Sequence, residues 1–286
     1  MNKEIEEIRK YYKEVIGIND FELSLNRGEA LGIIGVNGSG KTTFFKVLLG
    51  LLNADSGTIH FKGKNIKQLS NSLLGYLPEE RCLYKDFKVI DHVLFLGRLK
   101  GMEDETILER LDALLSTLKI PLYKYTHINK LSKGNQQKVQ IICALIHDPK
   151  IIILDEPLSG LDIVNVNLLK RLIHQLKSEG KYILLSSHQF DHIEQFCEHL
   201  IILKKGVITY KGELEKLIKT HASFHIRMSK SLSEYYVDII QFIGMKDNGR
   251  YLDFEIENKE LAYKQFKKIV NEQEQQSISL IESDIE

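Results

Sequence analysis

The fold of this chain is decided by the stretch Gly35-Val36-Asn37-Gly38-Ser39-Gly40-Lys41-Thr42-Thr43. The stretch matches the pattern GxxxxGK[ST], follows a short apolar run that begins at Ala30, and opens a helix predicted over 42–51. Glycines permit a tight loop whose backbone N–H groups converge on anionic oxygens, and the start of the helix adds partial positive charge. The sequence therefore predicts a phosphate-binding loop between a strand and a helix.

Two side chains of this loop predict which phosphates are bound. The Lys41 ammonium can reach the β- and γ-phosphates of a nucleoside triphosphate, and the Thr42 hydroxyl can ligate Mg²⁺. We therefore expect ATP and Mg²⁺ as ligands. The remaining residues expected to form the cradle around the phosphates are Gly35, Asn37, Gly38, Ser39, Gly40 and Thr43.

A second acidic motif supports hydrolysis. The run from Ile151 to Leu154 is fully apolar, as in a strand buried on both faces, and it ends in Asp155 and Glu156. A strand beside the phosphate loop can deliver Asp155 to the Mg²⁺ shell. Glu156 can then polarise a water that attacks the γ-phosphate.

Around these motifs the pattern alternates between strands and helices, which predicts an α/β fold with a largely parallel sheet. The segment from about 88 to 147 is helical, with a break at Pro121, and strands are expected early in the chain, near 15–26 and 57–63. The elements expected after the helical segment are the strands 151–154, 181–186 and 199–203 and the helices 163–178 and 189–197.

Beyond about residue 220 the pattern changes. Strands are predicted at 222–228 and 277–281, helices at 231–243 and 258–273, and a type I′ hairpin at Asn248-Gly249. The order β-α-β-β-α-β is ferredoxin-like. We expect a principal domain over 1–218, with a helical subdomain at about 80–145, and a small α+β domain over 219–286.

Composition restricts the class of protein. The 39 Lys plus Arg residues balance 39 Asp plus Glu residues, so no overall field favours nucleic acid, and no nucleic-acid partner is expected. No apolar stretch approaches the roughly 20 residues that cross a bilayer, and the charged N-terminus lacks a secretory pattern. The three scattered cysteines lack metal-ligand spacing. The sequence predicts a cytoplasmic protein that acts on a membrane only through another chain.

At this point the chain resembles the ABC ATPases over residues 1 to about 215. Leu131 to Lys138 reads LSKGNQQK and is similar to the family signature LSGGQ, which contacts the γ-phosphate bound by the opposite subunit. A Ser that caps a helix start is physically suited to binding an anion in trans. The resemblance implies a P-loop NTPase core with a helical and an antiparallel β subdomain. The signature residues that it implies as ATP contacts are Ser132, Gly134, Asn135 and Gln136.

Further family elements occur in order along the chain. Ser159 to Asp162 resembles the loop that crosses the dimer interface, and His188 resembles the switch histidine that contacts the γ-phosphate. Tyr12 lies where the family places an aromatic residue that stacks on adenine, although Tyr11 competes for this role. The resemblance thus implies Asp162 and Tyr12 as ATP contacts, and Lys41, Glu156 and His188 as catalytic residues.

Three departures from the family pattern affect the site. Glu79 stands where the family usually has Gln; a carboxylate can ligate Mg²⁺ and bind near the nucleotide, but it cannot donate a hydrogen bond to position water. Lys133 replaces a signature glycine. Asn135 occupies the usual Gln position, with Gln136 following.

The resemblance implies a homodimer, or a pair with a homologous subunit, that works on a separate transmembrane permease at the inner face of the membrane. The segment Leu77 to Arg81 and the form of the signature resemble the ABC-2 exporter branch. Leu83, Tyr84 and Phe87 can form an apolar cleft that receives a helix of the membrane subunit, or can simply pack beneath a loop. The alternative functions are an importer ATPase, a non-transport ATPase of translation or DNA repair, and a regulatory or immunity module.

Overall fold

The computed structural model describes residues 5–12, 15–66, 70–221, 223–238, 240–256, 259–272 and 278–283. The chain divides into two compact units, Met1–Leu214 and Glu215–Glu286. Each unit is described by itself. The domain boundary predicted after residue 218 falls inside α7 (Leu214–His221), the helix at the start of the second unit.

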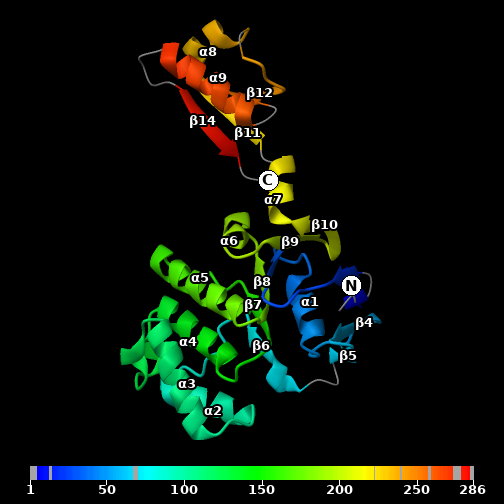
Figure 1. Ribbon diagram of the computed structural model, residues 1–286, viewed down its shortest axis with the longest axis vertical. Coiled ribbons are helices and arrows are strands. Elements are labelled where there is room, and N and C mark those ends of the chain that lie inside the picture. The colour runs from blue at the N-terminus through cyan, green and yellow to red at the C-terminus, as the bar shows by residue number, and fades with distance from the viewer. Residues whose placement is uncertain are drawn as a thin grey trace. The chain divides into compact units, whose positions relative to one another are not determined.

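The first unit contains a ten-stranded sheet in the order β5-β4-β1-β2-β10-β9-β3-β8-β7-β6 (Figure 1). One half, β9-β3-β8-β7-β6, is parallel throughout, and β1, β2, β4 and β5 pair antiparallel. The strands are β1 (Ile5–Tyr12), β2 (Val15–Leu23), β3 (Ala30–Ile34), β4 (Ser56–Phe61), β5 (Lys64–Asn65), β6 (Leu74–Leu77), β7 (Ile151–Asp155), β8 (Tyr182–Ser187), β9 (His199–Lys204) and β10 (Val207–Glu213).

Helices of the first unit fall into two groups. Those that directly follow a strand of the parallel half are α1 (Lys41–Leu48), α5 (Ile163–Ser178) and α6 (Phe190–Glu194). A helical region between β6 and β7 contains α2 (Val89–Leu99), α3 (Asp104–Thr117) and α4 (Lys133–Leu145) (Figure 1). The predicted break at Pro121 is a short 3₁₀ turn, Pro121–Tyr123, between α3 and α4.

The apolar run at 151–154 forms a central strand. All five residues of β7 are buried, because β6 and β8 flank it on both sides and helices cover both faces. Close packing also fixes α1: the rings of Phe21 on β2 and Phe44 on α1 are fully buried and stack with centroids 4.0 Å apart. This contact anchors the helix that begins at the phosphate-binding loop.

The second unit has its own sheet and core. Its elements are β11 (Ser223–Ser229), α8 (Lys230–Tyr236), β12 (Gly244–Asp247), β13 (Tyr251–Ile256), α9 (Lys259–Glu272) and β14 (Ile278–Ser283). The strands pair antiparallel in the order β12-β13-β11-β14, and Gly249, with φ 83°, makes the turn between β12 and β13. Ile226, Met228 and Phe254 are fully buried in this core.

Several elements differ from the sequence-based expectation. The strands β1 and β10 are not predicted: β1 carries charged residues and buries Ile8 at its centre, and β10 has no fully buried residue. The predicted helices 189–197 and 231–243 are shorter, as α6 and α8. Residues 222, 258, 273 and 277, at the ends of predicted elements, lie outside the described residues. Among the residues that the structure describes, no helix is both long and apolar enough to cross a membrane.

Candidate functional site

The loop between β3 and α1 is closely packed against the first strands. Gly40 has φ 110°, and a Cβ added there would lie 2.4 Å from the carbonyl oxygen of Gly17 on β2. No side chain fits this position, so the third loop glycine is required by both the backbone angle and the close contact. The loop therefore has a fixed shape, with its backbone N–H groups at the N-terminus of α1.

The Lys41 side chain is buried against the loop that precedes it. Its ammonium donates to the carbonyl of Gly35 at 2.5 Å and lies 3.4 Å from the carbonyl of Val36. It also lies 3.9 Å from a carboxylate oxygen of Glu156, and only 6% of the residue is exposed. A buried cation is thus held at the loop, facing the acid that ends β7.

Thr42 and Asp155 come together although 113 residues separate them. The Thr42 hydroxyl donates to Asp155 Oδ2 at 3.2 Å, and the Ser186 hydroxyl, from the end of β8, donates to Asp155 Oδ1 at 2.5 Å. Burial raises the pKa of Asp155, and the hydrogen bonds from Ser186 and Thr42 act in the opposite direction. A hydroxyl and a carboxylate in contact are oxygen ligands of the kind that Mg²⁺ prefers.

Glu156, the residue after Asp155, has a strained backbone conformation. It has φ 50°, which is uncommon for a residue other than glycine, and it is 5% exposed. Its backbone N–H donates to the Ser186 hydroxyl at 3.1 Å, and its Oε2 lies 3.0 Å from Nδ1 of His188. Its other oxygen, Oε1, has no hydrogen-bond partner among the described residues, and neither has the buried hydroxyl of Ser39. Buried polar atoms without partners are rare, so these two oxygens are candidates for pairing with a polar ligand.

Glu79 follows β6, the strand next to β7. Its negative charge acts on Asp155 and contributes to the raised pKa of that residue, which places the two carboxylates near each other. Gln140 on α4 holds this segment, since its amide nitrogen donates to the carbonyls of Pro78 at 3.0 Å and Glu80 at 2.9 Å. Sequence reasoning missed Gln140, and only its position as a polar residue on the helix face toward β6 could have indicated it.

The two candidate aromatic residues make different contacts. A Cβ added at Gly17 would lie 2.9 Å from the Tyr12 ring, and Gly17 is the residue whose carbonyl contacts Gly40 of the loop. Both tyrosines are exposed, Tyr11 to 41% and Tyr12 to 45%, and Lys10 Nζ lies 6.0 Å from the centroid of the Tyr12 ring. The hydroxyl of Tyr11 donates to Asn19 at 3.0 Å. The stacking of Tyr12 on adenine stays a prediction.

The signature residues form a second group at the start of α4. Ser132 is exposed, caps the helix and accepts from the backbone N–H of Asn135 at 3.3 Å. Gly134 lies beside the 159–162 turn, because a Cβ added there would be 3.9 Å from the Gly160 carbonyl oxygen. Asp162 in turn caps α5 by accepting from the N–H of Asn165 at 2.9 Å.

Gln136 turns inward from this group. Its amide nitrogen donates to the carbonyls of Ile128 at 3.2 Å and Leu131 at 3.1 Å, so it stabilises the turn before α4. Within the described residues, no hydrogen bond or ion pair joins a site residue of this second group to one of the loop group. The structure thus shows two separate groups of candidate site residues on one chain.

Known proteins are similar to a large part of this chain. The family model described as ABC transporter matches residues 18–159. An uncharacterized ABC transporter ATP-binding protein of Methanocaldococcus jannaschii is 45% identical over 218 residues, 76% of this chain and 80% of the relative. ABC transporter ATP-binding protein NatA of Bacillus subtilis is 36% identical over 218 residues, 74% of this chain and 87% of the relative.

A relative whose name states export and two solved structures are also similar to this chain. Nod factor export ATP-binding protein I of Cupriavidus pinatubonensis is 32% identical over 218 residues, 75% of this chain and 67% of the relative. A solved ATP-binding subunit of an ABC transporter superposes with a TM-score of 0.70 at 28% identity, covering 77% of this chain and 93% of that chain. A solved ATP-binding cassette in its ADP conformation gives a TM-score of 0.68 at 26% identity, covering 77% and 95%.

Proposed function

Since this chain belongs to the ABC transporter family as an ATP-binding subunit, we propose that it hydrolyses ATP with Mg²⁺ and drives export through a separate membrane subunit. The single observation that carries the hydrolytic part is the contact between the loop and the two acids that end β7. Lys41 Nζ lies 3.9 Å from Glu156, and Thr42 donates to Asp155 at 3.2 Å.

The residues present fit ATP and Mg²⁺. Ser39 Oγ and Glu156 Oε1 have no hydrogen-bond partner among the described residues and can pair with a ligand, and the phosphate charge is matched by Lys41 and the start of α1. Thr42, Asp155 and Glu79 supply oxygen ligands, which suit a hard cation. When bound, Mg²⁺ supplies positive charge to the phosphate oxygens.

Glu156 is the general base in this proposal. Its buried carboxylate accepts a proton from the attacking water, and Lys41 and the loop N–H groups stabilise the charge on the phosphoryl oxygens. His188 lies 3.0 Å from Glu156, which suits a residue that orients the base and contacts the γ-phosphate. Tyr12 offers its exposed ring to adenine.

A complete site requires two chains. Ser132, Gly134, Asn135 and Asp162 lie at the starts of α4 and α5, and Ser132 and Asp162 are exposed. We propose that they meet ATP bound by a second copy, so that two chains enclose two nucleotides. Gln136 supports this surface through the turn before α4. ATP stabilises the closed pair, and hydrolysis releases it.

Export is favoured over import by the relatives named for Nod factor export. We propose that the permease docks on Leu83 and the exposed rings of Tyr84 and Phe87, at the cytoplasmic face where ATP is available. The second unit has a ferredoxin-like order of elements and strands, which supports assigning it as a ferredoxin-like domain. No feature of the described residues favours the importer or non-transport alternatives.

ATP hydrolysis by the purified chain tests the proposal. Glu156→Gln removes the base and is expected to lower the turnover number by at least about a hundredfold, with ATP binding retained. Glu194→Gln, a change of the same type at an exposed position on α6, serves as the control and is expected to keep full activity. Full turnover by Glu156→Gln removes that residue from the role of base.

A further inference from the structure

The second unit contains a small cleft between α9 and the segment that follows α8. Its volume is 310 Å³. Proteins bind small molecules in clefts of about 300–1,000 Å³, so this one is at the lower end of that range. Ile240 and Gln241 line one side of the cleft, and residues of α9 line the other. The lining residues all belong to the second unit, so the cleft is separate from the nucleotide site.

Two glutamines hold the sides of the cleft together. The backbone N–H of Gln241 donates to Oε1 of Gln265 at 2.7 Å, and the amide nitrogen of Gln265 donates to the carbonyl of Gln241 at 3.0 Å. The side chain of Gln265 thus pairs with both backbone groups of Gln241. The segment after α8 is fixed against α9, as in a preformed binding site.

The lining residues differ in depth according to their polarity. Ile240 and Ile269 are buried, with 6% and 2% exposed, and Leu261 is partly buried. Lys264 and Lys268 are exposed and line the same cleft. The inner wall is therefore apolar and the outer edge is basic. An occupant with an apolar body and a polar end fits this arrangement.

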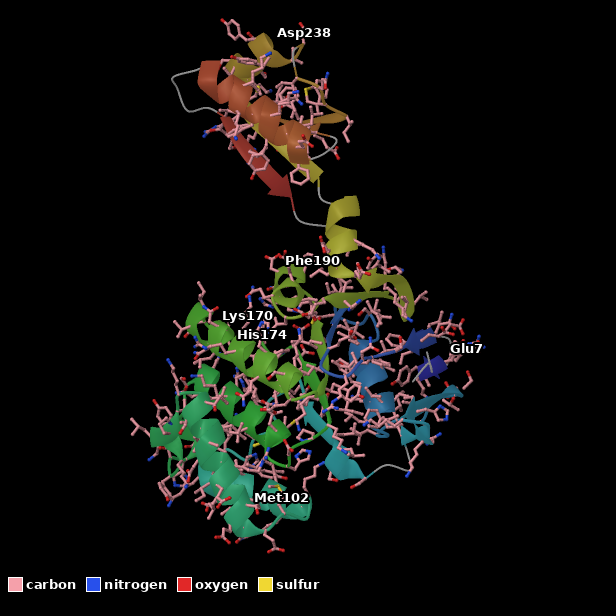
Figure 2. The ribbon with its side chains drawn as sticks, viewed as in Figure 1. Glu7, Met102, Lys170, His174, Phe190 and Asp238 are labelled. Atoms are coloured by element: carbon pink, nitrogen blue, oxygen red, sulfur yellow. The ribbon has the colours of Figure 1, made fainter. Side chains whose placement is uncertain are left out.

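The charge at the outer edge has one sign. Lys264 and Lys268 are four residues apart on α9, so their ammonium groups lie on the same face of the helix. Neither has an ion-pair partner among the described residues, and no acid is among the described residues that line the cleft. Asp238, which comes shortly before the lining segment, does not line it (Figure 2). Two like charges at this spacing repel each other, and an anion placed between them is attracted by both.

These features together restrict the chemistry of the occupant. A cation is repelled by both ammonium groups. A neutral apolar molecule leaves the two lysines unpaired, and a small inorganic anion leaves the apolar inner wall unused. A molecule that has both an apolar chain and an anionic end pairs with the whole cleft.

We propose that this cleft binds a small anionic amphiphile, such as a medium-chain fatty acid. Its apolar chain lies against Ile240, Leu261 and Ile269, and its anionic end lies between Lys264 and Lys268. The volume of the cleft favours a free molecule over a lipid that is part of a bilayer. This site goes beyond the proposed ATPase function and does not rest on it.

The test of the charge uses the full chain and three compounds with the same apolar chain: octanoate, octan-1-ol and octylammonium. Dissociation constants are measured by isothermal titration calorimetry at low ionic strength. Octanoate is expected to bind about tenfold more tightly than octylammonium, because two exposed ammonium groups attract one end and repel the other. Octan-1-ol should have an intermediate affinity. Equal affinities of octanoate and octylammonium, or a preference for octylammonium, overturn the proposal.

The test of the apolar wall compares octanoate with butanoate, which has the same anionic end and a shorter chain. Octanoate is expected to bind at least about tenfold more tightly, because four more CH₂ groups leave water. Equal affinities of the two carboxylates show that the inner wall takes no part and contradict the proposal.

Two variants locate the binding site. Lys268→Gln removes one charge of the cleft and is expected to weaken octanoate binding about threefold. It should leave the affinity for octan-1-ol unchanged, which shows that the cleft is still folded. Lys267→Gln, the same change at the neighbouring exposed residue outside the cleft, is the matched control and is expected to keep the wild-type affinity for octanoate. An equal effect of the two variants contradicts the assignment.

Vesicles of phosphatidylglycerol distinguish the two possible sources of an anionic amphiphile. Octanoate binding by a protein that does not sediment with the vesicles supports a free ligand. Binding to both, each weakened by Lys268→Gln, supports the site with a lipid as its source. Sedimentation with vesicles that Lys268→Gln weakens, in a protein that does not bind octanoate, assigns the two lysines to a membrane surface and overturns the proposal.

Discussion

Ser186 connects the two acids of the site through one hydroxyl. That hydroxyl donates to Asp155 at 2.5 Å and accepts from the backbone N–H of Glu156 at 3.1 Å, and Ser186 has no exposed surface. The left-handed backbone of Glu156 costs free energy, and this pair of hydrogen bonds helps to hold it. The geometry of the proposed base thus depends on a residue outside the motifs.

Ser186→Ala tests this dependence. The change leaves a buried N–H and a buried carboxylate each short of a partner, so the free energy of unfolding in urea is expected to fall by about 1–3 kcal/mol. Ser178→Ala, at an exposed hydroxyl that donates to a carbonyl at the end of α5, is the control and is expected to cost less than about 0.5 kcal/mol. Equal costs for the two variants contradict the role assigned to Ser186.

At the scale of single residues, the sequence identifies groups whose chemistry belongs to a short pattern. Lys41, Thr42, Asp155 and Glu156 are found in this way, and the structure brings them together. Ser186 and Gln140 are missed, because their importance comes from contacts with atoms that are distant in sequence. A serine at the end of a strand or a glutamine in a helix carries no local mark of such contacts.

Ion pairs hold the connection between α4 and β7. Asp148 has φ 55° and pairs with Arg110 from α3 at 3.3 Å and with Lys181, next to β8, at 2.8 Å. Arg110 also donates to the carbonyl of Ile146 at 2.6 Å. The ion pairs of Asp148 thus connect α3 and the start of β8 to the segment that leads into β7.

The pH dependence of stability tests this link. Burial acts to raise the pKa of Asp148, but Lys181 and Arg110 outweigh it and the pKa is lowered. Asn tolerates the left-handed conformation, so Asp148→Asn isolates the charge. At pH 7 the free energy of unfolding of the wild type is expected to exceed that of Asp148→Asn by at most about 1 kcal/mol, since the Asp148 side chain is largely exposed.

A lowered carboxyl pKa fixes the sign of this effect. The stabilisation is fully present above the unfolded pKa of about 3.9 and is lost as the pH falls through the lower pKa of the folded state. Unfolding free energies of the wild type and Asp148→Asn, measured from pH 7 down to pH 3, should therefore converge only at the acidic end. A difference that stays constant to the acidic end contradicts the assigned ion pairs.

At the scale of elements, strong patterns predict more than weak ones. The run in β7 and the periodic helix α5 lie where the sequence places them, because burial on both faces or along one helix face leaves a clear apolar pattern. The strands β1 and β10 leave no such pattern, since each carries few buried side chains. Their positions depend on pairing with β2, β4 and β9, which a local pattern does not contain.

Among the described residues, each of the two units has a hydrophobic core of its own. We expect two unfolding transitions in calorimetry, with ATP and Mg²⁺ raising only the midpoint of the first unit, because the ligand binds there. At a ligand concentration a hundred times its dissociation constant, the stabilisation is about 2.7 kcal/mol. A single transition, or an equal rise of both midpoints, contradicts two independent units.

The proposal that two chains complete each other's site concerns the whole molecule, and the sequence alone implies it only through the family resemblance. One chain places Ser132 on an exposed helix start and Lys41 in a buried loop, with no site contact between the two groups among the described residues. The central claim is that two chains complete each other's nucleotide site.

The mass of Glu156→Gln in solution tests this claim most directly, because slow hydrolysis keeps ATP in place. Sedimentation velocity of this variant with ATP and Mg²⁺ should show twice the mass of one chain. With ADP it should show the mass of one chain. The double variant Glu156→Gln, Ser132→Arg should bind ATP and form no dimer. A protein that binds ATP and keeps the mass of one chain, or a dimer that Ser132→Arg leaves intact, contradicts the account.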